Sequence, residues 1–73
     1  MKIYHVYFDQ DGLTLLLKAF KERLDARDYA REYAIEEHPS TIMFDGSTVI
    51  GLYDGDLADE HNFSVFVEAI EVQ

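Results

Sequence analysis

The sequence has no cysteine and no tryptophan, and only one proline and four glycines among its 73 residues. Without cysteine the chain can form neither a disulfide nor a thiolate–metal site, so its fold must depend on packing alone. No apolar run approaches the roughly 20 residues that a membrane-spanning helix needs, and the first residues do not resemble a secretory signal. We therefore expect a single domain over residues 1–73, located in the cytoplasm.

Basic residues are absent after Arg31. Residues 1–31 hold all six Lys and Arg together with five acids, whereas residues 32–73 hold ten acids and no base, and the formal net charge of the chain is −9. Nucleic acid and anionic membranes would repel a surface of this charge. The sequence therefore predicts no direct binding to nucleic acid or membranes, and it favours a protein as the partner.

The pattern of apolar residues predicts an α+β fold: a small antiparallel sheet with one helix packed on one face, in β-β-α-β-β-β order. Strands are expected where β-branched and aromatic residues concentrate, and turns at 9–12 and 45–47 are expected to close two hairpins. The segment 54–62 is expected to be an acidic loop. The expected strands are 2–8, 13–21, 41–44, 48–53 and 63–72.

Residues 13–21 are compatible with two structures. Their leucines follow helical spacing, so one long kinked helix is the alternative to a strand. The apolar stripe shifts near Leu24, however, and Asp25 is suited to cap a new helix at that point. We therefore expect a strand at 13–21 and a separate helix over about 26–37, which Pro39 ends.

The last expected strand is apolar on both faces, although one short helix can cover only one face of a sheet. Phe66, Ile70 and Val72 share the face that would stay open. A loop, a second copy of the chain or a partner could cover it, or it could remain exposed without a role. The alternative function is therefore a small structural or regulatory module that self-associates as a homodimer through these three residues.

No motif in the sequence predicts catalysis, a metal or a cofactor. The twelve-residue calcium loop requires Asp or Asn at position 5, Gly at position 6 and Glu at position 12, and counting from Asp54 these positions hold Ala58, Asp59 and Val65. The three histidines lie at none of the spacings of a zinc site, and no serine lies in a nucleophile motif. We expect a protein that is not an enzyme and binds no cofactor.

The acids of the helix and of the following segments predict a negatively charged binding surface. Carboxylates one helical turn apart, continued by acidic turns, can stand in for phosphates and pair with the Lys and Arg of a nucleic-acid-binding protein. The other interpretation is a solvated acidic face that only keeps the domain soluble. The candidate partner-binding residues are Glu32, Glu36, Glu37, Asp45, Asp54, Asp56, Asp59 and Glu60.

The stretch LTLLLKAFKERLDARDYAREYAIEEHP, a strand followed by a helix with small and aromatic residues on one side, resembles a module of small phage and mobile-element proteins. Its layout over roughly residues 2–50 is similar to that of some anti-CRISPR proteins and other phage-encoded inhibitors of host enzymes. The resemblance implies a DNA mimic or inhibitor that occludes a basic surface of a host protein, in the cytoplasm of the host cell. It implies no particular binding residue.

Overall fold

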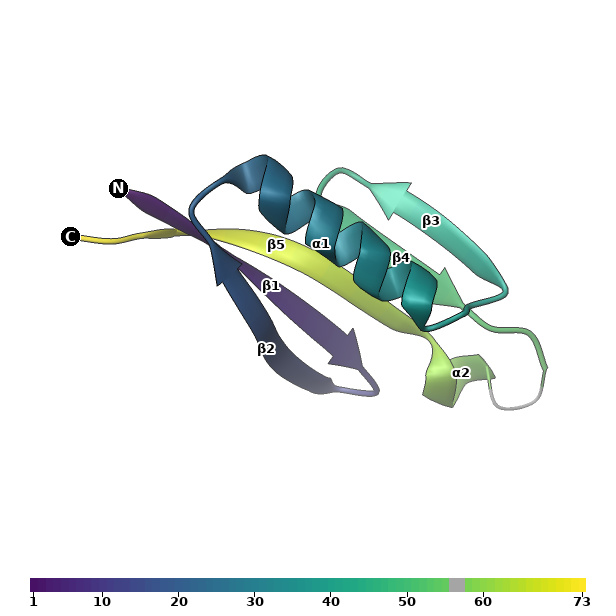
Figure 1. The fold of residues 1–73 in the computed structure, drawn as a ribbon. Coiled ribbons are helices and arrows are strands. Elements are labelled where there is room, and N and C mark those ends of the chain that lie inside the picture. Colours follow the sequence, from purple (N-terminus) through teal and green to yellow (C-terminus); the bar gives the residue numbers. More distant parts are fainter. Residues whose placement is uncertain (56–57) are drawn as a thin grey trace.

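The computed structural model describes residues 1–55 and 58–73, which form a five-stranded antiparallel sheet with a helix packed against it (Figure 1). The strand order is β2-β1-β5-β4-β3, so the first and last elements of the chain, β1 and β5, are neighbours in the middle of the sheet. The predicted α+β fold is confirmed. The elements are β1 (Lys2–Gln10), β2 (Leu13–Phe20), α1 (Arg23–Glu36), β3 (Thr41–Asp45), β4 (Thr48–Leu52), α2 (Ala58–His61) and β5 (Phe63–Glu71).

The ambiguous segment is a strand, as predicted. β2 pairs with β1 in antiparallel register from Tyr4 opposite Phe20 to Gln10 opposite Leu13, with an irregularity where the register passes Val6. The connection is a two-residue turn in which Asp11 and Gly12 both have positive φ, of 50° and 79°. Positive φ at both positions matches the right-handed twist of a hairpin, and Asp and Gly are residues that adopt it readily.

Helix α1 begins earlier than predicted. The residue before its first turn is Glu22, which is extended (φ −109°, ψ 133°) and makes no side-chain capping bond, so Asp25 lies within the first turn and is not the cap. The predicted break between strand and helix exists, but it falls at residues 21–22, and Leu24, in the first turn of the helix, is 61% exposed. The helix ends close to the predicted position, at Glu36.

The core is a thin layer between α1 and the central strands. Three alanines spaced one turn apart on α1 are completely buried, so the helix backbone lies close to the sheet. Aromatic side chains close the margins of this layer, for example Phe8 against Tyr33 with ring centroids 5.6 Å apart. The buried residues are Val6, Ala26, Ala30, Ala34, Val49, Phe63 and Val65.

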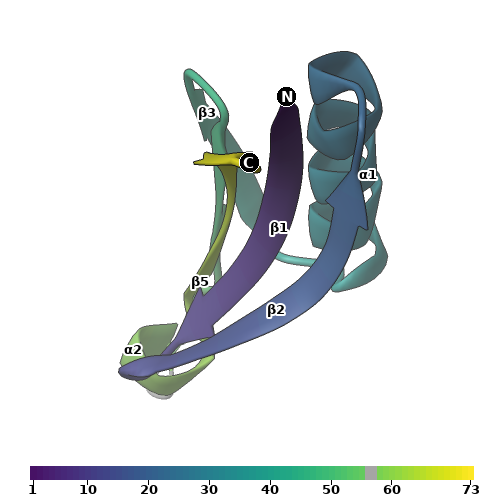
Figure 2. The ribbon, with the colours of Figure 1, turned by 90° about the vertical axis from the view of Figure 1, so that its left-hand side faces the viewer.

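The sheet extends beyond the helix at one end. The domain is elongated, 46 × 21 × 18 Å, and Figure 2 shows the tip of the β1–β2 hairpin beyond the last turn of α1, near α2. α2 is a single turn within the segment predicted to be a loop. The Gln10 side chain joins these two parts by donating a hydrogen bond to the His61 carbonyl oxygen, at 3.0 Å.

The two chain ends meet at the opposite end of the domain. The Met1 amino group lies 3.3 Å from a carboxylate oxygen of Glu71, and the Val72 amide donates to the Met1 carbonyl oxygen at 2.8 Å. None of the helices that the structure describes has the length and apolar character needed to cross a membrane.

Candidate functional site

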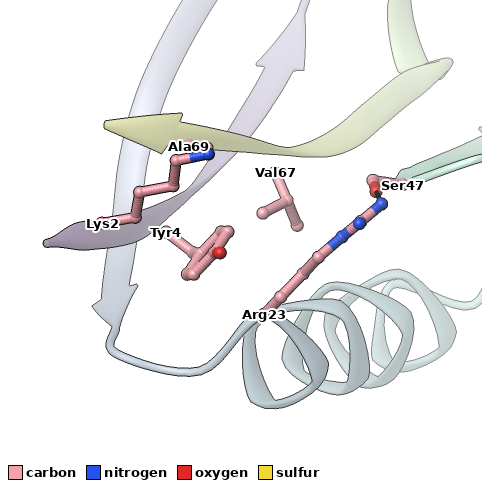
Figure 3. A pocket seen from close by; sticks show the side chains of 6 residues that line it. All are labelled: Lys2, Tyr4, Arg23, Ser47, Val67 and Ala69. Atoms are coloured by element: carbon pink, nitrogen blue, oxygen red, sulfur yellow. Dashed lines mark hydrogen bonds between the residues drawn. The ribbon is translucent and has the colours of Figure 1, made fainter. Parts of the chain in front are cut away.

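Two hollows lie on the surface of the part of the chain that the structure describes. The hollow in Figure 3, of about 200 Å³, lies at the start of α1, and there the Arg23 guanidinium reaches the Ser47 hydroxyl at 3.5 Å. Lys2 also lines it, and the backbone partner of Lys2 in β5 is Glu71. A second, more open hollow lies beside the β1–β2 turn and is lined by Asp9 and Asp11 without a base. Over residues 1–55 and 58–73, no three His, Asp or Glu side chains come together as metal ligands do.

A group of exposed carboxylates lies at the end of the domain where α1 stops. Its members come from four separate segments: the end of α1, the residues that follow β4, the single turn α2 and the β1–β2 turn. We call this group the acidic end. It consists of Glu36, Glu37, Asp54, Glu60 and Asp11, all exposed.

Hydrogen bonds around Tyr53 bring these segments together. Its hydroxyl donates to the carbonyl oxygen of Glu37 at 2.7 Å, and its amide donates to the Asn62 side chain at 2.8 Å. The amide of Asp54 donates to the Ser40 hydroxyl at 3.2 Å. Through these three bonds the residues after β4 are tied both to the end of α1 and to the segment that follows α2.

Burial and the negative charge of the acidic end raise the pKa of two tyrosines. Burial, and then the nearby Glu37 carboxylate, raise the pKa of Tyr33 above its ordinary value. The same two causes, in the same order, raise the pKa of Tyr53. Both phenols therefore stay neutral beyond the pH at which a free tyrosine ionises, and neither adds charge to this end at neutral pH.

Lys and Arg do not neutralise the acidic end. In the part of the chain that the structure describes, the single ion pair within 4 Å joins the Met1 amino group to Glu71, at the other end of the domain. Arg31 stacks on the Phe44 ring with its guanidinium carbon 5.0 Å from the ring centroid, and Arg23 bonds Ser47. The carboxylates of the acidic end therefore face solvent unpaired by any described Lys or Arg side chain.

The structure divides the acids that the sequence predicted as one surface. Glu32 lies exposed on α1, one turn before Glu36, and so extends the acidic end along the helix. Asp45 closes β3 at the hairpin that Arg23 contacts, which places it at the opposite end of α1. Asp59 belongs to α2, and Asp56 lies outside the described residues.

Sequence reasoning missed Asp11. It was assigned only to a turn, because nothing in the sequence links residue 11 to residues 54–60. The link is the hydrogen bond between the Gln10 amide group and the His61 carbonyl oxygen, which seats the β1–β2 turn beside α2. The signal in the sequence was Gln10, a polar residue directly before a two-residue turn. Its hydrogen-bond partner lies 51 residues away and could not be identified from the sequence.

On the face of the sheet opposite α1, two of the three residues predicted for self-association share an apolar strip. The Phe66 ring stacks on Tyr7 with centroids 5.2 Å apart and planes 24° apart, and Ile70 is the partner of Ile3 in the β1–β5 register. Val72 lies beyond the end of β5, where its amide binds Met1. We call Ile3, Tyr7, Phe66 and Ile70 the open-face strip.

Comparison with known proteins yielded no matching family model, no matching curated protein and no matching solved structure.

Proposed function

We propose that this protein is a non-enzymatic acidic binding protein whose acidic end occludes a basic, nucleic-acid-binding surface of a partner protein. The observation that carries the proposal is that five exposed carboxylates from four segments lie toward one end of the domain, with no described Lys or Arg paired to them. Such a surface mimics the charge of a nucleic acid and competes with it for the same cations. By this account the protein is an inhibitor of the DNA-mimic type.

The hydrogen bonds of Tyr53 support the proposal. They tie the backbone after β4 to the end of α1 and to Asn62, so less backbone entropy is lost when a partner binds there. Glu32 and Glu36 stand about one helical turn apart on α1, or about 6 Å along its axis. A partner with regularly spaced Lys or Arg can therefore pair with several carboxylates at once, and each such contact is lost as salt rises.

The test compares two double variants with the same change in charge. Asp54→Lys with Glu60→Lys reverses two carboxylates of the acidic end, and Asp28→Lys with Asp45→Lys reverses two exposed carboxylates elsewhere. The tagged wild-type protein is used to capture partners from lysate at low salt, and the affinity of each captured partner is then measured for all three proteins against salt. We expect the acidic-end variant to lose at least tenfold in affinity and to show a shallower salt dependence. Equal losses in both variants would show that total charge matters and its position does not.

A second candidate function is self-association through the open face, and the stacking of Tyr7 on Phe66 favours it because these rings lie on an uncovered face. The acids on the same face oppose it. Glu68 pairs in register with His5, and Asp9 with Ser64, so a second open face laid against this one would meet carboxylates at the margins of the strip. A strictly monomeric mass for the wild-type protein at high micromolar concentration would rule this candidate out.

A further inference from the structure

The outer edge of β2 is an apolar strand edge whose exposed side chains have no cover. β2 is one of the two edges of the sheet, and its outward-facing backbone groups have no strand beside them. Leu13, Leu15 and Leu16 are 61%, 47% and 55% exposed, although they belong to a regular strand. The cause is the projection of the hairpin beyond α1, which leaves this part of the strand uncovered on both faces (Figure 2).

The usual protection of an edge strand is weak here. Natural edges are blocked by charges, by proline or by short length, but β2 is eight residues long and has no proline, and Lys18 is its single charged residue. The Lys18 ammonium lies toward the helix side, 5.3 Å from the centroid of Phe20 and 5.6 Å from that of Tyr29. From Leu13 to Leu16 the register with β1 is regular, so this stretch presents an uninterrupted edge for strand addition.

Opposite charges at the two ends of β2 favour a second copy of β2 as the strand that pairs with this edge. Asp11 precedes the strand and is exposed, whereas the other end carries Lys18 and Lys21, followed by Glu22 and Arg23, and so holds three bases against one acid. The two ends are separated by roughly 23 Å at about 3.3 Å per residue, which exceeds the screening length of about 8 Å at physiological salt. Antiparallel pairing of β2 with a second β2 therefore sets the acidic end of each strand beside the basic end of the other, and the attraction acts twice.

The other edge of the sheet lacks this complementarity. β3 is five residues long and carries a carboxylate at each end: Asp45 is its last residue, and Asp54 is bonded to Ser40 immediately before its first residue. Antiparallel pairing of two β3 strands would bring these carboxylates together across the pair. The β3 edge is thus unsuited to pairing with a second copy because its two ends carry like charges, whereas the two ends of β2 carry opposite charges.

We propose that two copies of this chain pair through their β2 strands in antiparallel orientation, which joins the two sheets into one continuous sheet and covers the leucines of the hairpin. The dimer interface lies within residues 1–31, which carry all the Lys and Arg and are not strongly acidic. Asp11 belongs both to the acidic end and to this interface, whereas Glu36, Glu37, Asp54 and Glu60 lie outside β2 and its flanking residues. The interface therefore overlaps the surface proposed above for the basic partner only at Asp11.

The test uses a matched pair of single variants and the mass of the protein in solution. Leu16→Lys places charge on β2, and Met43→Lys does the same on β3; both residues are about half exposed, and both face away from α1. Sedimentation over a range of concentrations is expected to give twice the chain mass for the wild type and for Met43→Lys, and the chain mass for Leu16→Lys. Circular dichroism confirms that each variant is folded. A monomeric wild type, or equal loss of the dimer in both variants, would overturn the proposal.

Charge reversal gives a second measurement that does not depend on the leucines. Lys21→Glu sets a carboxylate opposite Asp11 of the other copy, and Asp11→Lys sets an ammonium group opposite Lys21 of the other copy, so each variant alone is expected to dimerise about tenfold more weakly because two like-charge contacts form. Mixed together, the two variants regain both attractive contacts and are expected to form a heterodimer as strong as the wild-type dimer. A mixture no stronger than either variant alone would overturn the antiparallel arrangement.

Discussion

The Tyr53 hydroxyl donates a 2.7 Å hydrogen bond to the carbonyl oxygen of Glu37, the residue that caps the C-terminus of α1. The carbonyls of the last helical turn lack partners within the helix, so this bond satisfies one of them. It also fixes the residues after β4 against the end of the helix. The bond therefore contributes to the stability of the domain and to the geometry of the acidic end at once.

Tyr53→Phe is expected to lower the free energy of unfolding by about 1 kcal/mol, because it removes one hydrogen bond and leaves the ring packing against Phe63 intact. Urea denaturation measures the change. Tyr4→Phe is the control, since the described residues offer its hydroxyl no hydrogen-bond partner. Equal stabilities of the two variants would mean that the Glu37 carbonyl is as well satisfied by water as by Tyr53.

Alkaline pH is expected to weaken the domain through Tyr33 and Tyr53. Burial and the Glu37 carboxylate raise the pKa of both phenols above the ordinary value of 10.0, so the folded state holds their protons more tightly than the unfolded state. Their contribution to stability is complete below pH 10 and is lost as the pH rises through the raised pKa values, because the unfolded state then binds fewer protons. Denaturation midpoints measured from neutral pH upward should fall in this window.

Replacing Glu37 tests the electrostatic part of that shift. Glu37→Gln removes the negative charge and is expected to lower the pKa of both tyrosines toward 10, while burial keeps them somewhat raised. Ultraviolet absorbance of the phenolates follows the titration. Glu32→Gln removes the same charge from an exposed position on α1 and should leave both tyrosines almost unchanged. If the two variants shift the titration equally, Glu37 has no special proximity to the two rings.

Most of the fold was predictable from local patterns. Alternating apolar residues and the two turns gave the strands and hairpins, because side-chain period and turn chemistry act within a few residues. The start of α1 was predicted wrongly because capping preference pointed to Asp25, whereas the helix begins at Arg23 without a side-chain cap. The strand order was not predicted, since the adjacency of β1 and β5 depends on contacts between the two ends of the chain.

The candidate site was less predictable than the fold for the same reason. Helix periodicity placed Glu32 and Glu36 on one face of the helix, but the separation of Asp45 and the position of Asp11 depend on tertiary contacts. The sequence shows how many carboxylates are present, and the structure shows toward which end of the domain each described one lies. The negatively charged binding surface predicted from residues 32–60 is thus reduced to the residues at one end of the domain.

Ala30→Leu is expected to destabilise the protein by about 1–3 kcal/mol or more. Ala30 is completely buried where α1 lies on the sheet, so a larger side chain must push the helix away or adopt a strained rotamer. Glu32→Leu introduces the same side chain on the exposed side of α1 and should change stability by less than about 0.5 kcal/mol. Urea denaturation compares the two, and a small effect at both positions would contradict the close helix–sheet packing.

Gly51→Ala is expected to destabilise the domain although alanine ordinarily suits a strand better than glycine. A Cβ atom at position 51 would overlap the ring of Phe63, which is its register partner in β5 and is almost completely buried. The overlap is expected to cost about 1–3 kcal/mol, which exceeds the gain of about 0.5–1 kcal/mol from removing a strand glycine.

The same contact predicts coupling between the two positions. Phe63→Leu removes the ring atoms that the new methyl group would meet, so Gly51→Ala should cost less in the Phe63→Leu protein than in the wild type. Denaturation of the four proteins of this double-mutant cycle gives the coupling energy, expected at about 1 kcal/mol in the sense that the double variant is more stable than the sum of the single changes implies. Strict additivity would show that β4 and β5 adjust without moving the ring. Glycine at position 51 would then reflect backbone preference and not the space that the Phe63 ring needs.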